Sequence, residues 1–210
     1  MVLGVTGGIA SGKSTVVNML REMGALVISA DELARELVVP GSVVLFQLQQ
    51  RFGQQILMPD GTLDRKRLGD YVFAHPMARR ELEEIMHPAI AELSKLRLQQ
   101  AVSAQQATVG LVVYEAPLLF EVGARDRVEQ VLTVTVADDV QLRRLQQRDN
   151  CSAADASRRV AAHMPQSEKA RLSDYVIDNS GARQALLQQV AKLYKILVQD
   201  ESGVDGAPEP

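Results

Sequence analysis

The feature that most constrains this chain is a glycine-rich segment close to its start. Residues 7–14, GGIASGKS, match the pattern G-x-x-x-x-G-K-[ST]. They follow a short apolar run at residues 2–6 and precede a segment of helical periodicity, so the pattern lies between a predicted strand and a predicted helix. This context indicates a phosphate-binding loop and not a glycine turn that happens to precede a helix.

Each residue type in the loop has a chemical role. Glycines let backbone N–H groups wrap around an oxyanion, the helix N-terminus adds its positive end, and the lysine reaches the β- and γ-phosphates. Lys13 is therefore a candidate catalytic residue, and Ser14 is a candidate Mg²⁺ ligand. The expected nucleotide-binding residues of the loop are Gly8, Ala10, Ser11, Gly12, Lys13, Ser14 and Thr15. The loop alone does not separate a kinase from an ATPase or a GTPase switch, because all three share this cradle.

Short β-branched runs alternate with longer segments of helical periodicity along the chain. The candidate strands are residues 2–6, 26–29, 109–114, 130–136 and 175–177. This alternation is typical of βα units around a parallel sheet. The sequence therefore predicts an α/β fold, a P-loop NTPase-type parallel sheet flanked by helices, as a single domain over residues 2–200.

About 80 residues without a convincing strand separate the second and third candidate strands, far more than a crossover needs. Proline and glycine pairs divide this stretch. The expected helices lie near residues 43–52, 64–73, 77–86 and 89–106. We therefore expect a helical insert at about residues 36–106.

A polar segment at about residues 141–172 is rich in arginine and precedes the last candidate strand. It predicts an arginine-bearing lid in which Arg144 and Arg148 lie one helical turn apart, although a solvated helix face would have the same composition. Residues 201–210 combine acids, glycine and proline with almost nothing to bury, which predicts a flexible tail. The sheet core then comprises about residues 1–35, 107–140 and 173–198.

The composition excludes several classes of protein. Of the 210 residues, 46% are apolar, which is ample for a buried core. A net charge of −3 lacks the broad basic field of a nucleic-acid binder, so no nucleic-acid partner is expected. No apolar run approaches the ~20 residues that cross a bilayer, so no membrane contact is expected and the predicted location is the cytoplasm. The single cysteine, Cys151, predicts no internal disulfide, and the oligomeric state is left open.

Polar groups follow three of the candidate strands, whose carboxyl ends should meet at one ligand crevice. Asp31 follows the second strand, where it can accept a proton from an acceptor hydroxyl or hold Mg²⁺ through water; alternatively it caps a helix at residues 32–39. Glu115 follows the third strand as a candidate metal-site acid or a plain turn acid. Asn179 and Gly181 follow the last strand, where they can present an amide and backbone groups to adenine or form an Asx turn.

The order of these segments resembles the dephospho-CoA kinase family. The segments that carry the resemblance are TGGIASGKST at 6–15, SAD at 29–31 with AR at 34–35, HP at 87–88, PLLFE at 117–121, QRD at 147–149 and DYVIDN at 174–179. They span about residues 2–198. The resemblance implies Mg²⁺-dependent transfer of the ATP γ-phosphate to the 3′-hydroxyl of dephospho-CoA, the final step of coenzyme A synthesis, with a helical CoA-side domain and a lid.

The resemblance also implies roles for individual residues. Asp31 would be the catalytic base, Arg35 an acceptor-side contact, and His87 a group near the acceptor. Taken without the resemblance, a histidine before Pro88 is an ordinary turn residue. The residues implied on the ATP side are Arg144 and Arg148 in the lid and Asn179 and Gly181 in the adenine loop.

The chain departs from the family's pattern at four positions. They are Ser29 for an aspartate, Ala10 for a glycine, His75 for an asparagine and His163 for a glutamine. The serine leaves Asp31 as the only carboxylate of its pair, and Ala10 requires a loop conformation compatible with a Cβ atom. Because neither change removes Lys13 or Asp31, we expect activity.

Two other functions remain open from the residues alone. Another small-molecule kinase, such as a nucleoside or nucleotide kinase, would use the same core, insert and lid with a different acceptor. A nucleotide-dependent switch with negligible phosphoryl transfer would carry a guanine-selecting Asn-Lys-x-Asp segment, which this sequence lacks.

Overall fold

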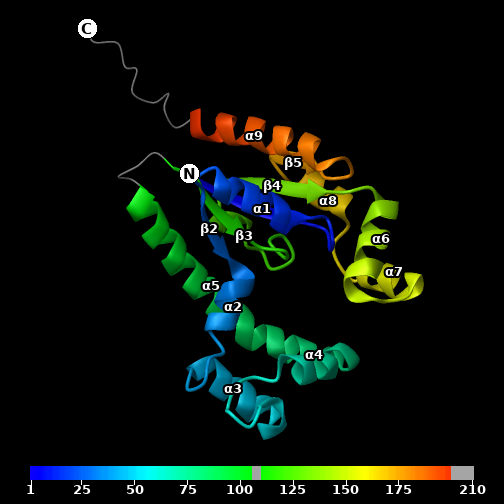
Figure 1. Cartoon of the computed structure of the whole chain (residues 1–210). Coiled ribbons are helices and arrows are strands. Elements are labelled where there is room, and N and C mark those ends of the chain that lie inside the picture. Colours follow the sequence, from blue (N-terminus) through cyan, green and yellow to red (C-terminus); the bar gives the residue numbers. More distant parts are fainter. Residues whose placement is uncertain (106–109, 200–210) are drawn as a thin grey trace. The chain divides into compact units, whose positions relative to one another are not determined.

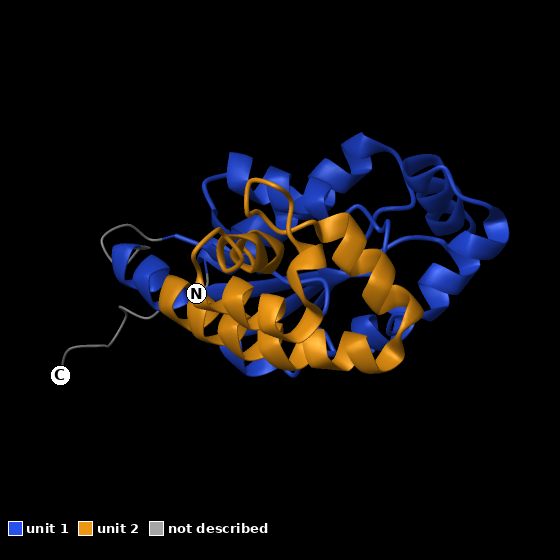
Figure 2. Cartoon of the chain, turned by 90° about the horizontal axis from the view of Figure 1, so that it is seen from below, with its two compact units in different colours: residues 1–28, 98–210 blue, residues 29–97 orange. Residues whose placement is uncertain are grey.

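The computed structural model describes residues 1–105 and 110–199, so the predicted tail lies outside the described residues. The chain divides into two compact units (Figure 2). Unit 1 comprises the described residues of Met1–Ile28 and Leu98–Pro210, and unit 2 comprises Ser29–Arg97. The chain passes between the units twice, at the end of a strand and within a long helix.

A five-stranded sheet of order β2-β3-β1-β4-β5 forms the centre of unit 1 (Figure 1). Its strands are β1 (Val2–Gly7), β2 (Leu26–Ser29), β3 (Val112–Glu115), β4 (Gln130–Thr135) and β5 (Tyr175–Asp178). The central strand β1 pairs in parallel with β3 and β4, and β4 pairs in parallel with β5. The predicted α/β fold with a parallel sheet is confirmed. The third strand starts later than predicted, and Val109 of that prediction lies outside the described residues.

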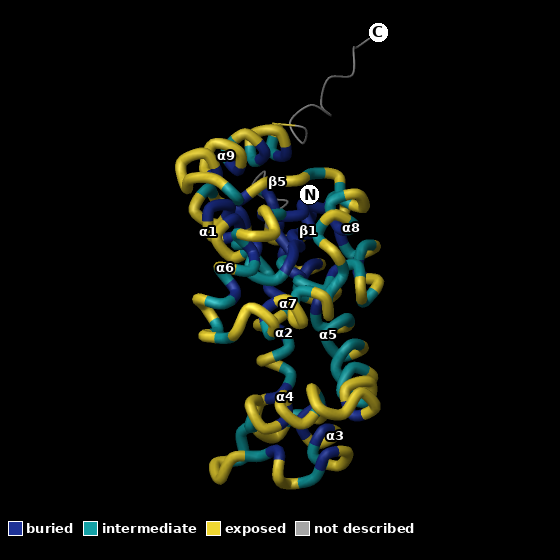
Figure 3. Tube along the Cα trace, turned by 90° about the vertical axis from the view of Figure 1, so that its right-hand side faces the viewer, coloured by how far each residue is buried: buried dark blue, intermediate teal, exposed yellow. Residues whose placement is uncertain are grey.

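Burial explains why the segment VLGVTG forms the central strand. All six residues of β1 are buried, as expected for a parallel strand that is covered on both faces. The helices α1 (Lys13–Glu22) and α9 (Arg183–Gln199) pack against each other and join β1 in one apolar core (Figures 1 and 3). Gly24, with φ +105°, ends the turn after α1 in the left-handed region that glycine favours.

The segment predicted as a lid forms three helices in unit 1. These are α6 (Asp138–Asp149), α7 (Ala153–Ala161) and α8 (Gln166–Arg171). Ser152 caps α7, because its hydroxyl accepts a hydrogen bond from the N–H of Asp155 at 3.1 Å. Helix α8 packs against β4 and β1, so the end of this segment is part of the sheet core. A short 3₁₀ turn, Arg125–Arg127, precedes β4.

Unit 2 is helical and has its own apolar core. Its elements are α2 (Ala30–Glu36), α3 (Val43–Phe52), a 3₁₀ turn (Gln54–Ile56), α4 (Arg65–Ala74) and α5 (Pro76–Gln105), which continues into unit 1. Ser42 caps α3 and Asp64 caps α4, each by accepting a hydrogen bond from a backbone N–H three residues later. Leu48 is fully buried at the centre of this core.

The prediction of two helices separated at His87-Pro88 is wrong. Helix α5 runs without a break through Pro88, and it begins at Pro76, where the missing N–H of proline would have no partner inside the helix. An interior proline costs about 3 kcal/mol. Apolar side chains on both sides of the proline, such as Ile85 and Ala89, pack against the unit 2 core, and this packing keeps the helix continuous.

Among the described residues, no helix is long and apolar enough to cross a membrane.

We expect Pro88→Ala to raise the thermal stability. The substitution restores one backbone hydrogen bond in α5 and removes the clash of the ring with the preceding turn, which together should add about 1–3 kcal/mol. Pro88 is exposed, so no core packing is lost. Thermal and urea unfolding would measure the change.

The control for this substitution is Pro59→Ala. Pro59 lies in an exposed turn outside any helix, so alanine there restores no helical hydrogen bond and frees the unfolded chain. Its melting temperature should not rise. A melting temperature for Pro88→Ala at or below that of the unmodified protein would contradict the explanation given for α5.

Candidate active site

The phosphate loop connects β1 to α1 as a tight coil of backbone. The N–H of Ser11 donates to the carbonyl of Gly8 at 3.2 Å, and Gly12, the N-cap of α1, accepts from the N–H of Thr15 at 3.0 Å. Lys13 is the first residue of α1, with Ser14 exposed beside it. The loop therefore places the predicted lysine and serine at a helix N-terminus, where N–H groups and the helix dipole favour an anion.

Ala10 has a left-handed backbone, with φ +58°. A Cβ atom can enter this region, but a residue other than glycine pays roughly 1–2 kcal/mol to do so. The departure from glycine noted in the sequence therefore falls at a position that favours glycine. Neighbouring contacts must hold the loop in this conformation.

Lys13, at the start of α1, lies close to Glu115, at the end of β3. Lys13 Nζ lies 3.9 Å from Glu115 Oε1, and their side chains are 13% and 16% exposed. The register of the sheet produces this pair, because Glu115, the last residue of β3, lies beside Val5 of β1. Two predicted site residues far apart in the sequence are thus brought together. The role of Glu115 at a metal stays a prediction.

Asn179 packs against the phosphate loop. Its side chain is buried, and its Nδ2 donates to the carbonyl of Ser11 at 2.8 Å. A Cβ atom added at Gly12 would lie 2.0 Å from this Nδ2, so the contact requires glycine at position 12. The sequence suggested an adenine contact for Asn179 and Gly181. That contact stays a prediction, while the amide of Asn179 has a defined partner in the loop.

Arg144 and Arg148 both lie on α6, as the one-turn spacing predicted, but their guanidinium groups have different partners. Arg144 Nη2 donates to the carbonyl of Asn179 at 3.0 Å. Arg148 donates to both carboxylate oxygens of Asp149, at 2.7 and 3.1 Å. This hydrogen bond raises the pKa of Arg148 and lowers the pKa of Asp149, which also accepts from Arg159 at 2.7 Å. Arg144 therefore contacts the turn that follows β5, whereas Arg148 pairs with its neighbour on α6.

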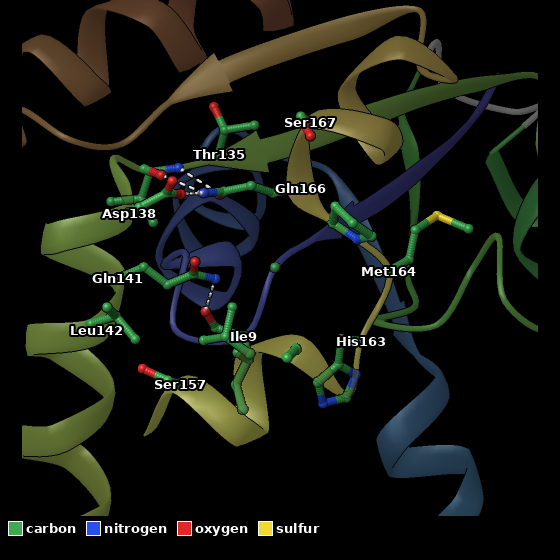
Figure 4. A pocket seen from close by; sticks show the side chains of 15 residues that line it. Ile9, Thr135, Asp138, Gln141, Leu142, Ser157, His163, Met164, Gln166 and Ser167 are labelled. Atoms are coloured by element: carbon green, nitrogen blue, oxygen red, sulfur yellow. Dashed lines mark hydrogen bonds between the residues drawn. The ribbon is translucent and has the colours of Figure 1, made fainter. Parts of the chain in front are cut away.

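A cavity of about 830 Å³ lies beside the phosphate loop (Figure 4). It is lined by Gly8 and Ile9, by the end of β4, and by side chains of α6, α7 and α8. Gln166 closes one side by accepting from the N–H of Val136 at 3.0 Å and donating to its carbonyl at 2.6 Å. His163, one of the four departures, also lines this cavity.

Sequence reasoning missed two buried polar residues, one that contacts the phosphate loop and one that contacts the loop following β3. Gln141 donates from Nε2 to the carbonyl of Ile9 at 2.8 Å (Figure 4). Lys169 is 1% exposed and donates from Nζ to the carbonyl of Pro117 at 2.7 Å and to Glu121 at 2.8 Å. Pro117 and Glu121 belong to the PLLFE segment, whose contact with Lys169 the sequence does not reveal. No local pattern marks Gln141 or Lys169, because both stand in ordinary polar helix sequence.

Asp31, Arg35 and His87 belong to unit 2. Helix α2 begins at Ala30 with Ser29 at the N-cap position, so Asp31 lies in the first turn and the alternative that it caps the helix is wrong. Asp31 and Arg35 are exposed and lie one turn apart on α2. His87 is half-buried within α5 and is not a turn residue.

Comparisons with known proteins identify the family of this chain. The family model for dephospho-CoA kinase matches residues 1–185. The dephospho-CoA kinase of Geobacter metallireducens is 49% identical over 195 residues, which cover 93% of this chain and 96% of that protein. That of Syntrophotalea carbinolica is 47% identical over 205 residues, with 98% and 96% covered.

Two solved structures have a similar fold. The dephospho-CoA kinase from Campylobacter jejuni is 27% identical and superposes with a TM-score of 0.72 over 95% of this chain and 98% of that one. A crystal structure of a Thermus thermophilus protein is 29% identical with a TM-score of 0.76, covering 98% of both chains. With most of its length matched by the family model and by relatives near half identity, the chain belongs to the dephospho-CoA kinase family.

Proposed function

We propose that this kinase transfers the γ-phosphate of ATP to the 3′-hydroxyl of dephospho-CoA, forming coenzyme A and ADP in the final step of coenzyme A biosynthesis. The observation that carries the proposal is a complete phosphate loop, with Lys13 at the start of α1, in a chain of this family. The loop supplies the donor site that every such transfer needs.

The residues of unit 1 account for the binding of ATP. Backbone N–H groups of the phosphate loop would bind the phosphates of ATP, and the ammonium group of Lys13 would neutralise charge on the β- and γ-phosphates. Arg144 is held at the carbonyl of Asn179, from which its guanidinium can also reach an anion above the loop. Asn179 and Gly181 follow β5, and we assign the adenine to this turn.

The oxygen donors beside the phosphate loop, one on α1 and one at the end of β3, fit Mg²⁺. The hydroxyl of Ser14 and the carboxylate of Glu115 are hard oxygen ligands of the kind that Mg²⁺ prefers. Mg²⁺ is usually held by one or two protein oxygens together with substrate phosphates, so these two side chains suffice on the protein side. When bound, the ion neutralises charge that develops on the phosphates.

Asp31 serves as the base in this proposal. As the new bond forms between the acceptor oxygen and the γ-phosphorus, the acceptor O–H bond breaks and its proton passes to the Asp31 carboxylate. The bond between the γ-phosphorus and the β,γ-bridging oxygen breaks, and ADP leaves with the electron pair. Asp31 is exposed at the start of α2, so its carboxylate is accessible to an acceptor. Arg35, on the same face, and His87 would contact the acceptor.

Product analysis tests the proposed reaction. Incubation with ATP, Mg²⁺ and dephospho-CoA should add the mass of one phosphate to the acceptor, with the new phosphate at the 3′ position. Nucleosides and nucleotides offered as acceptors should give little product. Faster phosphorylation of a nucleoside, or ADP release at an equal rate without acceptor, would overturn the proposal.

Lys13→Ala should abolish useful turnover, because the ammonium group stabilises the transferring phosphate.

We expect Asp31→Asn to lower kcat by about 10²–10⁴, because an amide cannot take the acceptor proton. Its stability should hardly change, since Asp31 is exposed and is not the helix cap. The affinity for ATP should stay within a few fold. Steady-state kinetics, thermal melting and ATP titration of the same preparation would measure all three quantities.

The matched control is Glu32→Gln, which removes an exposed carboxylate from the same turn of α2. It should keep kcat within about twofold, because surface substitutions away from the chemistry have small effects. If both variants lost activity equally, the charge of the helix terminus and not proton transfer would explain the loss. If Asp31→Asn kept normal kcat, the proton would need another acceptor.

A further inference from the structure

Gln141 is a buried amide in contact with the phosphate loop. It stands on α6, is 4% exposed, and donates from Nε2 to the carbonyl oxygen of Ile9 at 2.8 Å (Figure 4). A glutamine is rarely so deeply buried unless its polar atoms are satisfied, because desolvating an unpaired amide is costly. The hydrogen bond to Ile9 is therefore a specific contact between the first lid-segment helix and the loop.

The same amide also lies against Gly8. A Cβ atom added at Gly8 would be 2.8 Å from Gln141 Nε2, closer than a real Cβ contact allows. Gly8 is thus the position where the side chain of Gln141 reaches the loop backbone. The amide fits into the space that the missing Cβ leaves, and this fit aligns it with the next carbonyl along the chain.

The carbonyl that accepts this hydrogen bond belongs to the peptide that joins Ile9 to Ala10. In a trans peptide the C=O and the N–H point in opposite directions. A carbonyl held toward Gln141 therefore turns the N–H of Ala10 to the opposite side. The rotation of this peptide also sets φ of Ala10, which is +58°. Among the described residues, only Ala10 and Asn150 combine a side chain with a positive φ.

A second amide holds the other half of the loop. Asn179 Nδ2 donates to the carbonyl of Ser11 at 2.8 Å, from the turn that follows β5. The two amides thus hold two different carbonyls of the loop, and each is packed against a glycine, Gly8 or Gly12. Only the half held by Gln141 contains a residue other than glycine in the left-handed region.

We propose that Gln141 is a positioning residue for ATP binding. Its amide holds the Ile9-Ala10 peptide in the orientation that keeps Ala10 left-handed and the loop N–H groups arranged for a phosphate. The contact offsets the conformational cost of alanine at position 10. The proposal depends on ATP binding by the loop and is independent of which alcohol accepts the phosphate.

The test begins with Gln141→Met, which keeps the length of the side chain but cannot donate a hydrogen bond. Losing one net hydrogen bond that organises the site should raise the Kd of Mg-ATP about three- to tenfold. The KM for ATP should rise with it, and kcat at saturating ATP should change little. Isothermal titration without any acceptor measures Kd, so the result does not depend on the proposed acceptor. Thermal melting reports whether the variant is folded.

The matched control is Gln147→Met. Gln147 is exposed on the same helix, so the same chemical change there should leave Kd for ATP unchanged. A general loss of helix α6 would affect both variants, whereas loss of the hydrogen bond to Ile9 affects Gln141→Met alone. If Gln141→Met is poorly folded, Gln141→Leu removes the same donor with a more compact apolar side chain and is held to the same expectation.

A double-mutant cycle with Ala10→Gly tests whether Gln141 affects ATP affinity through the backbone conformation of Ala10. Glycine enters the left-handed region without a Cβ penalty, so the loop should no longer need Gln141 to hold that conformation. In the glycine background, Gln141→Met should change Kd less than about twofold. The proposal is overturned if a folded Gln141 variant binds ATP as tightly as the unmodified protein. It is equally overturned if the loss of affinity is the same with alanine and with glycine at position 10.

Discussion

The need to hold backbone N–H groups of one short loop toward a single anion governs the arrangement of unit 1. A flexible coil would lose this arrangement, because each unrestrained residue has many accessible conformations. The loop is therefore fixed by the central strand β1 on one side and α1 on the other, and by amides that pack against Gly8 and Gly12. Both glycines are needed because a Cβ atom would occupy the space of those amides.

Lys169, which is buried, fixes the loop that follows β3 in a similar way. Removing an ammonium group from water costs several kcal/mol unless its partners are well placed. Lys169 meets this condition with Glu121 and the carbonyl of Pro117, which also accepts from the hydroxyl of Thr6 at 3.1 Å. Helix α8 is thereby tied to the loop that follows β3 and Glu115. The end of the arginine-rich segment is thus part of the core and not a separate surface flap.

The predictions that proved wrong concern helix boundaries, where tertiary packing outweighs local sequence rules. Proline pairs predicted a helix boundary at Pro88, but the apolar face of α5 is continuous and its burial outweighs the lost hydrogen bond. An aspartate after a strand predicted a possible cap, but α2 begins at Ala30, two residues earlier than predicted, so Asp31 lies in its first turn and is not the cap. Propensity is a weak guide wherever packing sets the ends of a helix.

The sequence by itself determined the phosphate loop, the parallel α/β fold and the family, because these depend on short ordered segments such as residues 7–14 and on the period of apolar residues. Only the tertiary structure decided which groups hold the loop. Gln141 reaches Ile9 from 132 residues away, and Asn179 reaches Ser11 from 168 residues away. No local pattern encodes such contacts, because they arise only when parallel strands bring the ends of distant segments to one edge of the sheet.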